Sequence, residues 1–466
     1  MSIDWAAFGV DLHLEFDPAS GRRAGLERAL REAIRAGRLT PETRLPSTRT
    51  LALELGLARG TVSAAYDQLV AEGYLNARTG SGTIVADLAG SRAPAAQPAA
   101  DVPALRYDLR PGSPDVSTFP TAAWLRATRR ALATAPVTAY DYGDPRGRIE
   151  LRTALADYLG RARGVLAHPD QIVITSGYVQ ALALLAGVLD GAALAMEDPG
   201  LSFHRDVVRH ARAEVVALPV DERGARTDLL GTPAFAAVRS VVVTPAHHYP
   251  TGVTLHPHRR HAATTWARER AGLIIEDDYD GEFRYDRQPV GALQGMAPEH
   301  VVYVGTAAKT LGPALRLAWM VLPGRLVEPV VRDKRHTDLH TEAIGQLALA
   351  DLITSHAYDR HIRACRLRYR RRRDLLVSRL GRHVALHGIA AGLHAMVSLP
   401  TTGPSEQEVL DRAAAHGLAL GGLGDHWHTP GDHPPGLIIG YGTPNEGGYP
   451  AALDTLARVL GSGPRG

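Results

Sequence analysis

A stretch rich in alanine and proline divides this sequence into two parts of different character. Residues 87–104 contain three prolines and lack aromatic residues and apolar periodicity, a composition typical of an extended, semi-rigid linker. Because 466 residues are enough for two or three domains, we expect a small domain at residues 1–86 and a larger one at residues 105–466.

Composition narrows the class of protein. Hydrophobic residues make up 45% of the chain and charged residues 22%, as in ordinary globular proteins. The single cysteine, Cys365, excludes an internal disulfide and fits a reducing compartment. Residues 1–10 do not have the pattern of a secretory signal, and the most apolar segment, 181–196, is interrupted by Asp190 and is too short to span a bilayer. We therefore expect a cytoplasmic protein without a membrane partner.

The pattern before the linker predicts a winged helix-turn-helix. Apolar residues recur at helical spacing over residues 26–34, and Ser47 can cap a second helix that ends at Gly56. A third helix is expected over about residues 59–72, followed by a β-hairpin within residues 74–85 that turns at a Gly-rich segment.

Charge and fold together favour DNA as the partner of this first domain. Residues 18–86 hold ten Arg against six Asp and Glu, an excess that suits a polyanion. In a helix-turn-helix the third helix meets base edges in the major groove, and flanking elements contact the backbone. The alternative is a protein-interaction module whose Arg residues are solvated. The residues expected to contact a double-stranded DNA operator are Arg49, Arg59, Gly60, Thr61, Ser63, Arg78, Gly80 and Gly82.

The same segment resembles a known family. Residues 45–52, 55–62, 72–74 and 80–83 look like the GntR family of winged-helix proteins, over about the first 86 residues. Ala58 departs from the Ser usual before the Arg of that motif, which is expected to cost one phosphate contact.

After the linker, short apolar runs alternate with helical segments. Runs at residues 172–174, 241–243, 273–275 and 301–304 predict an α/β domain with a mainly parallel sheet. From about residue 341, Arg-rich helical stretches and short strands predict a smaller α+β part.

Lys309 is one of only two lysines among 52 basic residues. A lysine can lose its proton in a desolvated site and attack an aldehyde, which Arg cannot do. Strand alternation places Asp277 and Tyr279 on one face, at a strand end where open α/β sheets bind ligands. A carboxylate can keep a pyridine nitrogen protonated and a phenol can donate to a phenolate oxygen, so these residues suit pyridoxal 5′-phosphate (PLP). The alternative, Asp277 and Asp278 as metal ligands, lacks accompanying ligands.

Two further patterns bear on ligands. Ser176, Gly177 and Tyr178 lie between a strand and an apolar helix, so their amides are expected to bind a phosphate together with Thr306 and Arg316. Histidines cluster at residues 247–261 and 426–433; loop histidines are more often solvated than metal-bound, and we expect no metal site.

Residues 105–460 resemble the fold-type I aminotransferases. The matching segments are 140–147, 197–200, 244–252 and 305–312. Joined to a GntR-like head, the chain resembles the MocR branch of the GntR family. This resemblance implies PLP held by Lys309 as a Schiff base, with Asp277 at the pyridine nitrogen, Tyr279 at O3′, and Ser176, Gly177, Tyr178, Thr306 and Arg316 around the phosphate. It also implies a head-to-tail homodimer with exchanged head domains, in which Tyr142 reaches the phosphate of the second subunit.

Departures from the aminotransferase pattern indicate a regulator. Tyr249 replaces the usual Asn, Leu201 an aromatic residue, Ala308 a Ser, and Ile438 the late Arg that binds a substrate α-carboxylate. We therefore predict a PLP-dependent transcriptional regulator whose small-molecule effector is PLP or a PLP–amine adduct, with vitamin B6 synthesis as a candidate target. The alternatives are a regulator that senses an amino acid through PLP and an active aminotransferase.

Overall fold

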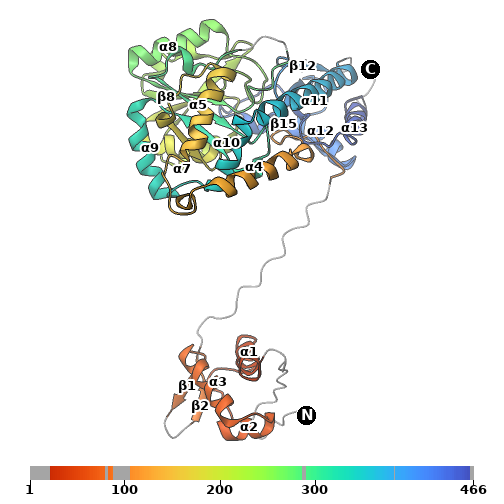
Figure 1. Cartoon of the computed structure of the whole chain (residues 1–466). Coiled ribbons are helices and arrows are strands. Elements are labelled where there is room, and N and C mark those ends of the chain that lie inside the picture. Colours follow the sequence, from red (N-terminus) through yellow and green to blue (C-terminus); the bar gives the residue numbers. More distant parts are fainter. Residues whose placement is uncertain (1–20, 79–81, 88–104, 286–289, 382–383, 462–466) are drawn as a thin grey trace. The chain divides into compact units, whose positions relative to one another are not determined.

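The computed structural model describes residues 21–78, 82–87, 105–285, 290–381 and 384–461. The chain forms two compact units, Met1–Val102 and Pro103–Gly466 (Figure 1). The predicted linker at 87–104, apart from Asp87, and the predicted DNA contact Gly80 lie outside the described residues.

The first unit contains the elements of a winged helix-turn-helix, as the sequence predicts. They are α1 (Arg22–Arg35), α2 (Thr48–Leu55), α3 (Arg59–Ala71), β1 (Leu75–Arg78) and β2 (Gly82–Val85), with β1 and β2 antiparallel. The side chain of Ser47 accepts a hydrogen bond from Thr50 N and caps α2, and Gly56 ends α2 with a left-handed φ of 63°. Local capping and turn residues therefore set the boundaries of α2.

One core joins the three helices and the hairpin. Leu26 and Leu30 of α1, Leu51 of α2 and Val62 of α3 are fully buried in it. The Tyr66 hydroxyl donates to the carbonyl of Pro46, at 3.0 Å, which ties α3 to the segment before α2. These contacts fix the orientation of α3 within the unit.

The predicted DNA contacts lie at the start of α3, at the start of α2 and in the hairpin. Arg59 and Gly60 are exposed at the start of α3, Thr61 and Ser63 are half-buried there, and Arg49 is exposed at the start of α2. In the hairpin, β1 ends at Arg78 and β2 begins at the exposed Gly82. Ala58 is the N-cap residue of α3 and provides no side-chain hydrogen bond, so the first amides of α3 are open to an outside acceptor.

The second unit is built on an eight-stranded sheet. Its order is β4-β11-β10-β9-β8-β5-β6-β7, with β11 antiparallel to both neighbours and β7 antiparallel to β6. The strands are β4 (Ile172–Thr175), β5 (Ala193–Asp198), β6 (Val215–Asp221), β7 (Gly224–Ala225), β8 (Val238–Val243), β9 (Leu273–Asp278), β10 (Val301–Thr306) and β11 (Ala318–Val321). The parallel pairs confirm the predicted α/β class.

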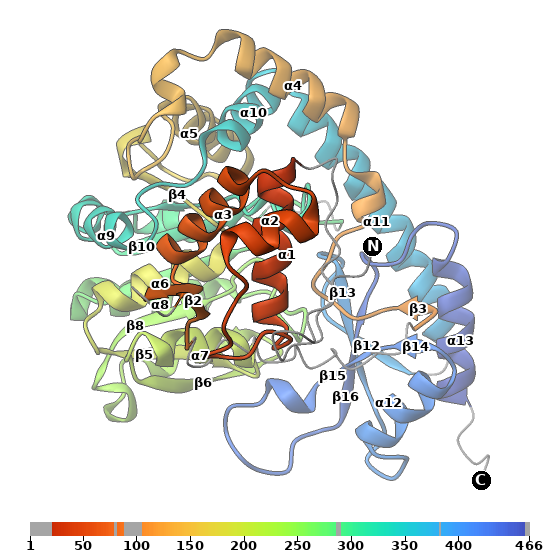
Figure 2. The ribbon, with the colours of Figure 1, turned by 90° about the horizontal axis from the view of Figure 1, so that it is seen from below.

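Helices cover both faces of this sheet. Alternate strand residues point to opposite sides, so Val242 and Ile275 enter one core and Val241 and Ile274 another. The helices of this part are α4 (Thr121–Thr134), α5 (Ile149–Arg163), α6 (Tyr178–Val188), α7 (Ser202–His210), α8 (Pro257–Arg270), α9 (Gly324–Thr337) and α10 (Ala343–Thr354). Figure 2 shows the strands β10, β8, β5 and β6 following one another in the order of the sheet.

A smaller α+β part completes the second unit and includes residues of α11 (Ala357–Leu380). Its expected boundary near residue 341 stays a prediction. Leu349 of α10 still packs with Ile174 of the large sheet, whereas Cys365 and Tyr369 of α11 join the core of the smaller part. Its other elements are β3 (Tyr107–Asp108), β12 (Ala385–His387), β13 (His394–Ser398), α12 (Glu406–Ala415), β14 (Leu418–Ala419), β15 (Gly421–Gly422), β16 (Gly436–Gly440) and α13 (Tyr449–Gly461).

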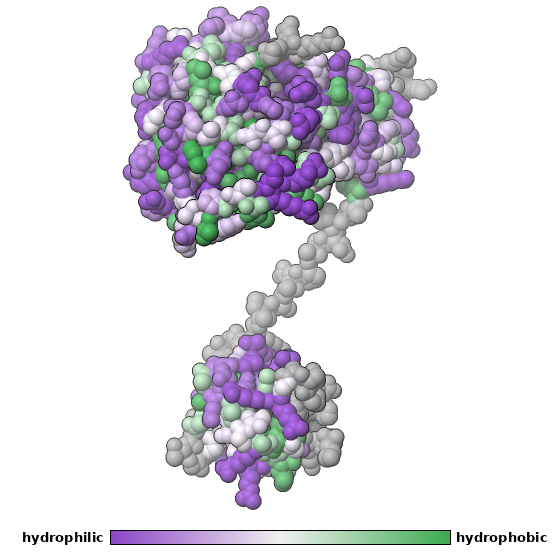
Figure 3. Space-filling view, viewed as in Figure 1, coloured by the Kyte–Doolittle hydropathy of each residue, from purple (hydrophilic) through white to green (hydrophobic). Residues whose placement is uncertain are grey.

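Among the described residues, no helix is both long and apolar enough to cross a bilayer. In Figure 3, hydrophilic and hydrophobic residues are interspersed over the visible face of the larger unit.

Candidate functional site

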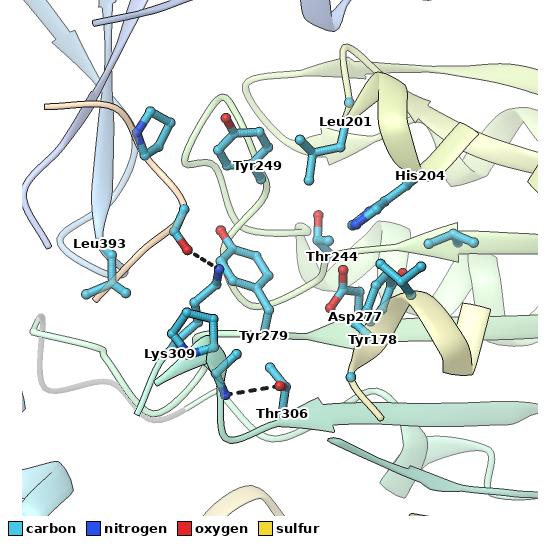
Figure 4. A pocket seen from close by; sticks show the side chains of 18 of the residues that line it. Tyr178, Leu201, His204, Thr244, Tyr249, Asp277, Tyr279, Thr306, Lys309 and Leu393 are labelled. Carbon is cyan, nitrogen blue, oxygen red and sulfur yellow. Dashed lines mark hydrogen bonds between the residues drawn. The ribbon is translucent and has the colours of Figure 1, made fainter. Parts of the chain in front are cut away.

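A cavity of about 310 Å³ lies at the carboxyl ends of the parallel strands (Figure 4). The strands β8, β9 and β10 end at this edge, and the antiparallel β11 begins there. The smaller part contributes Leu393 and His394. The cavity is lined by Lys309, Asp277, Tyr279, Gly177, Tyr178, Thr306 and Arg316, seven of the nine residues that the sequence predicts for the cofactor.

Lys309 follows β10 and its amine points into the cavity. The amine donates a hydrogen bond to the carbonyl of Gly112. Burial lowers the pKa of Lys309, and the charges of Asp280 and Asp277 act in the opposite direction. A lysine with a lowered pKa loses its proton more readily, which is the condition for attack on a carbonyl carbon.

Three consecutive carboxylates at the end of β9 have three different environments. Glu276 accepts hydrogen bonds from the amides of Leu293 and Gln294, at 2.7 and 2.9 Å. Asp278 faces the side of the sheet that carries α5, and Asp277 faces the cavity. The strand alternation therefore separates a ligand-facing carboxylate from its two structural neighbours.

Asp278 is paired on the far side of the sheet. Arg163 of α5 donates to both of its oxygens, at 2.6 and 2.9 Å, and the Tyr303 hydroxyl donates at 2.8 Å. The side chains of Arg163 and Asp278 are 5% and 1% exposed. A Cβ atom at Gly281 would lie 2.1 Å from an Asp278 oxygen, so the chain can pass this pair only with glycine there.

Asp277 has no such pairing. Its Oδ1 is buried and has no hydrogen-bond partner among the described residues. Burial raises its pKa well above the ordinary value, and the charge of Asp278 acts in the same direction. A buried carboxylate oxygen without a partner is costly, and it suits a protonated ring nitrogen. The predicted role of Asp277 therefore fits this environment.

A cradle for an anion lies at the start of α6. Gly177 has a φ of 99°, and a Cβ atom there would lie 2.4 Å from the guanidinium of Arg316. Arg316 donates to the carbonyl of Ser176, at 2.5 Å. The amide of Ser176 is itself bonded to the Gln180 side chain, at 2.7 Å, and Ser176 does not line the cavity. The cradle thus consists of the start of α6, Gly177 and Arg316, and Ser176 lies behind it.

Thr306 and Tyr142 differ in their placement. The Thr306 hydroxyl lines the cavity and accepts a hydrogen bond from Ala308 N, at 3.1 Å. Tyr142 is 82% exposed and does not line the cavity. The structure therefore does not bring Tyr142 together with the other predicted residues within one chain.

Several cavity residues had no predicted role. His204 lies beside Tyr178, with ring centroids 4.7 Å apart, and burial lowers its pKa to about 4, which keeps it neutral. Tyr249 and His394 line the cavity, and Tyr249 shares a hydrogen bond with His426 at 3.1 Å. These residues come from distant segments, so no spacing in the sequence connects them.

No free cation for a substrate carboxylate is present at two expected places. Ile438, which replaces the substrate-binding Arg, has no charge, and the guanidinium of Arg205 is engaged. Ile438 is fully buried in β16 opposite Met396 of β13. Arg205 lines the cavity, but its guanidinium donates to the carbonyls of Gly200, His426 and Trp427.

One group of side chains within the described part of the chain has metal-like spacing. Ligand atoms of His247, Asp280 and His394 lie within 4.8 Å of one another. His247 Nδ1 and Asp280 Oδ2 are 2.9 Å apart, so a hydrogen bond accounts for two members of this group. The absence of a metal site remains a prediction.

The fold and the cavity define a winged-helix protein whose body has the aminotransferase architecture. Two family profiles match the chain: "Bacterial regulatory proteins, gntR family" over residues 23–85 and "Aminotransferase class I and II" over residues 109–418. The kynurenine aminotransferase of Pyrococcus horikoshii, solved with PMP, has a similar structure, with a TM-score of 0.70 and 25% identity over 77% of this chain and 91% of that one.

Curated relatives match this chain over both of its parts. The chain is 32% identical to the pyridoxine biosynthesis regulator PdxR of Corynebacterium glutamicum, over 93% of each protein. It is 34% identical to the probable rhizopine catabolism regulatory protein MocR of Rhizobium meliloti, over 88% of each. The chain therefore belongs to the MocR-type family of transcriptional regulators, in which a GntR-type head precedes an aminotransferase-like domain.

The environment of Glu276 predicts a pH dependence of stability. Burial raises the pKa of Glu276 to about 7 from an ordinary 4.5, and the Asp278 charge adds to this shift. Between these values the folded state holds a proton that the unfolded state releases, so this carboxyl destabilises the fold as pH rises, until both states are ionised above pH 7. Glu276→Gln lacks this titration.

Urea unfolding of both proteins at several pH values measures the effect. We expect the free energy of unfolding of Glu276→Gln, relative to the natural protein, to rise by about 3 kcal/mol from pH 4.5 to 7. A difference that stays constant over this interval would show that Glu276 is not titrating as its burial implies.

Proposed function

We propose that this protein is a transcriptional regulator that binds PLP in the cavity at the strand ends and uses the ligand state of that cavity to control its binding to DNA. The observation that carries the proposal is the convergence of Lys309, Asp277, Tyr279 and the Gly177–Arg316 cradle on one cavity. In the folded chain these groups match the aldehyde, ring nitrogen, phenolate oxygen and phosphate of PLP. A DNA-binding role supports a location with the chromosome, in the cytoplasm.

Each side chain has a defined task toward the cofactor. Bound PLP supplies an electron-withdrawing ring and an aldehyde that condenses with amines. Asp277 would hold the proton on the ring nitrogen, and Tyr279 would donate a hydrogen bond to the phenolate oxygen. Arg316, Gly177 and the start of α6 would bind the phosphate. Lys309, with its lowered pKa, would provide the amine.

The effector is proposed to be PLP itself or a small amine joined to it. Among the described residues that line the cavity, the cations are Lys309, Arg205 and Arg316. Arg205 is engaged with three carbonyls and Arg316 belongs to the phosphate cradle, so no guanidinium is left for an α-carboxylate. The name of the relative PdxR, a pyridoxine biosynthesis regulator, supports control of vitamin B6 synthesis as the output.

The second candidate is an active aminotransferase, which the fold similarity favours. The two functions differ in one measurement. An aminotransferase converts an amino acid and a keto acid in many turnovers, whereas the proposed regulator leaves such a mixture unchanged and alters a DNA footprint when PLP or an amine is added.

Replacing Lys309 tests the cofactor proposal. Lys309→Ala removes the only amine that lines the cavity among the described residues, so the visible absorbance of bound PLP should be lost. Lys309→Arg keeps the charge and should lose the absorbance as well, because Arg does not condense with aldehydes. Absorption spectra after gel filtration with PLP measure both. Unchanged absorbance in Lys309→Ala would contradict the proposal.

Replacing Arg59 tests the DNA surface. Arg59 is exposed at the start of α3, where a side chain of a recognition helix meets base edges. Arg59→Ala should weaken operator binding by about 10- to 100-fold, the equivalent of one lost base contact. Fluorescence anisotropy with a labelled operator measures the loss. Arg28→Ala, an exposed arginine of α1, is the matched control, and equal effects of both changes would refute a specific role for Arg59.

We also propose a homodimer. The first half of the larger unit exposes Leu125, Leu132, Val137, Tyr140 and Ile149, which are 44% to 85% exposed, and exposed apolar groups of this kind mark interaction surfaces. Tyr142, 82% exposed beside them in sequence, would then reach the second subunit. Val137→Glu should lower the dimer fraction in sedimentation equilibrium, and Leu166→Glu, at another exposed apolar site, should not. A natural protein that sediments as a monomer would refute the proposal.

A further inference from the structure

A buried His–Asp pair lies directly behind Tyr279. His247 follows β8 and Asp280 follows β9, and their side chains are 2% and 1% exposed. His247 Nδ1 is 2.9 Å from Asp280 Oδ2, and the Tyr279 hydroxyl is 3.3 Å from the same Nδ1. One imidazole nitrogen thus has two neighbours that compete for it.

The hydrogen bond to Asp280 determines whether Nδ1 of His247 carries a proton. An ionised carboxylate only accepts hydrogen bonds, so a bond to Asp280 requires the proton of His247 to be on Nδ1. A protonated Nδ1 cannot accept the phenolic proton of Tyr279. Toward His247, the Tyr279 oxygen can therefore act only as an acceptor. The hydroxyl proton of Tyr279 then points away from His247.

The imidazole is held in place by glycines from both parts of the unit. Gly392 has a φ of 67°, and a Cβ atom there would lie 2.1 Å from His247 Nδ1 and Cε1. Gly252, with a φ of 72°, closes the other side, where a Cβ atom would lie 3.4 Å from Nε2. His394 packs against the ring, with centroids 4.7 Å apart. These contacts leave the ring little room to turn away from Asp280 and Tyr279.

The phenol of Tyr279 keeps its proton and faces the cavity. Burial raises the pKa of Tyr279 well above its ordinary value, and the charges of Asp280 and Asp277, the neighbouring Tyr249 and a hydrogen bond to Asp280 act in the same direction. Figure 4 shows the Tyr279 hydroxyl on the side of the cavity that holds the Lys309 amine. A protonated phenol that cannot donate to His247 has two acceptors left, Asp280 and a ligand in the cavity, and the hydrogen bond from His247 to Asp280 weakens the first of them.

We propose that His247, fixed by Asp280, is a positioning residue that directs the Tyr279 hydroxyl proton toward the phenolate oxygen of the cofactor. This inference rests on the proposed function, because it requires PLP in the cavity. A hydrogen bond from Tyr279 stabilises the deprotonated form of the phenolate oxygen of PLP. This hydrogen bond therefore lowers the pH at which the visible absorbance of bound PLP changes. Without a donor at the Nδ1 position, Asp280 binds the Tyr279 proton more strongly, and the cofactor loses this hydrogen bond.

The test is a pair of substitutions in the full chain loaded with PLP. The amide nitrogen of Asn can occupy the position of Nδ1, so His247→Asn should leave the absorbance midpoint within a few tenths of a pH unit. His247→Leu has no donor and should raise the midpoint by about one to two pH units, as Tyr279→Phe should. If His247→Leu loses PLP, His247→Gln replaces it, because its amide reaches the Nε2 position instead.

A double substitution separates positioning from a general structural effect. In the Tyr279→Phe background, His247→Leu should add no further shift, because both changes remove the same hydrogen bond. Equal shifts in the Asn and Leu variants, no shift in either, or a Leu shift that persists in the Phe background would each overturn the inference. Absence of PLP absorbance in the natural protein would instead refute the proposed function, so the two failures are distinguishable.

Discussion

The buried ion pair between Arg163 and Asp278 is the interaction on which the cavity depends. It joins α5 to the end of β9, and Tyr303 of the neighbouring strand completes it. Removal of one partner from such a pair typically costs about 3–5 kcal/mol, because a charge stays buried and uncompensated. Since adjacent strand residues face opposite ways, holding Asp278 on one side of the sheet also holds Asp277 on the other. The ligand-facing carboxylate is thus oriented by a contact that no ligand touches.

The cavity takes its walls from both parts of the second unit. Asp277 and Lys309 come from the large sheet, whereas Leu393 and His394 come from the smaller part. The segment after β15 is also bound to the large part, because Asp198 accepts hydrogen bonds from the amides of His428 and Thr429. A ligand that contacts both walls therefore affects how the two parts are held together. Coupling between two sites in a regulator requires a ligand-dependent difference of this kind.

Much of the fold could be predicted from the sequence because its signals are local. The cap at Ser47, the turn at Gly56 and the apolar spacing of α1 each act within a few residues, and the head matches its prediction closely. The strands β5, β6, β7 and β11 of the large sheet were missed. The Ala-rich start of β5 follows the apolar α6 within a few residues, so the two look like one segment, and the exposed alternation of β6 is weak.

The sequence by itself determined which chemical groups were available: a rare lysine, a carboxylate and phenol two residues apart, and a glycine at a strand–helix junction. Residue type and short spacing carry that information. Only the tertiary structure decided that Ser176 stands behind the anion cradle, that Tyr142 points away from the cavity, and that His247 and Asp280 stand behind Tyr279. The physical reason is that these relations join segments far apart in the chain, and sheet order and helix packing, which no local pattern encodes, bring such segments together.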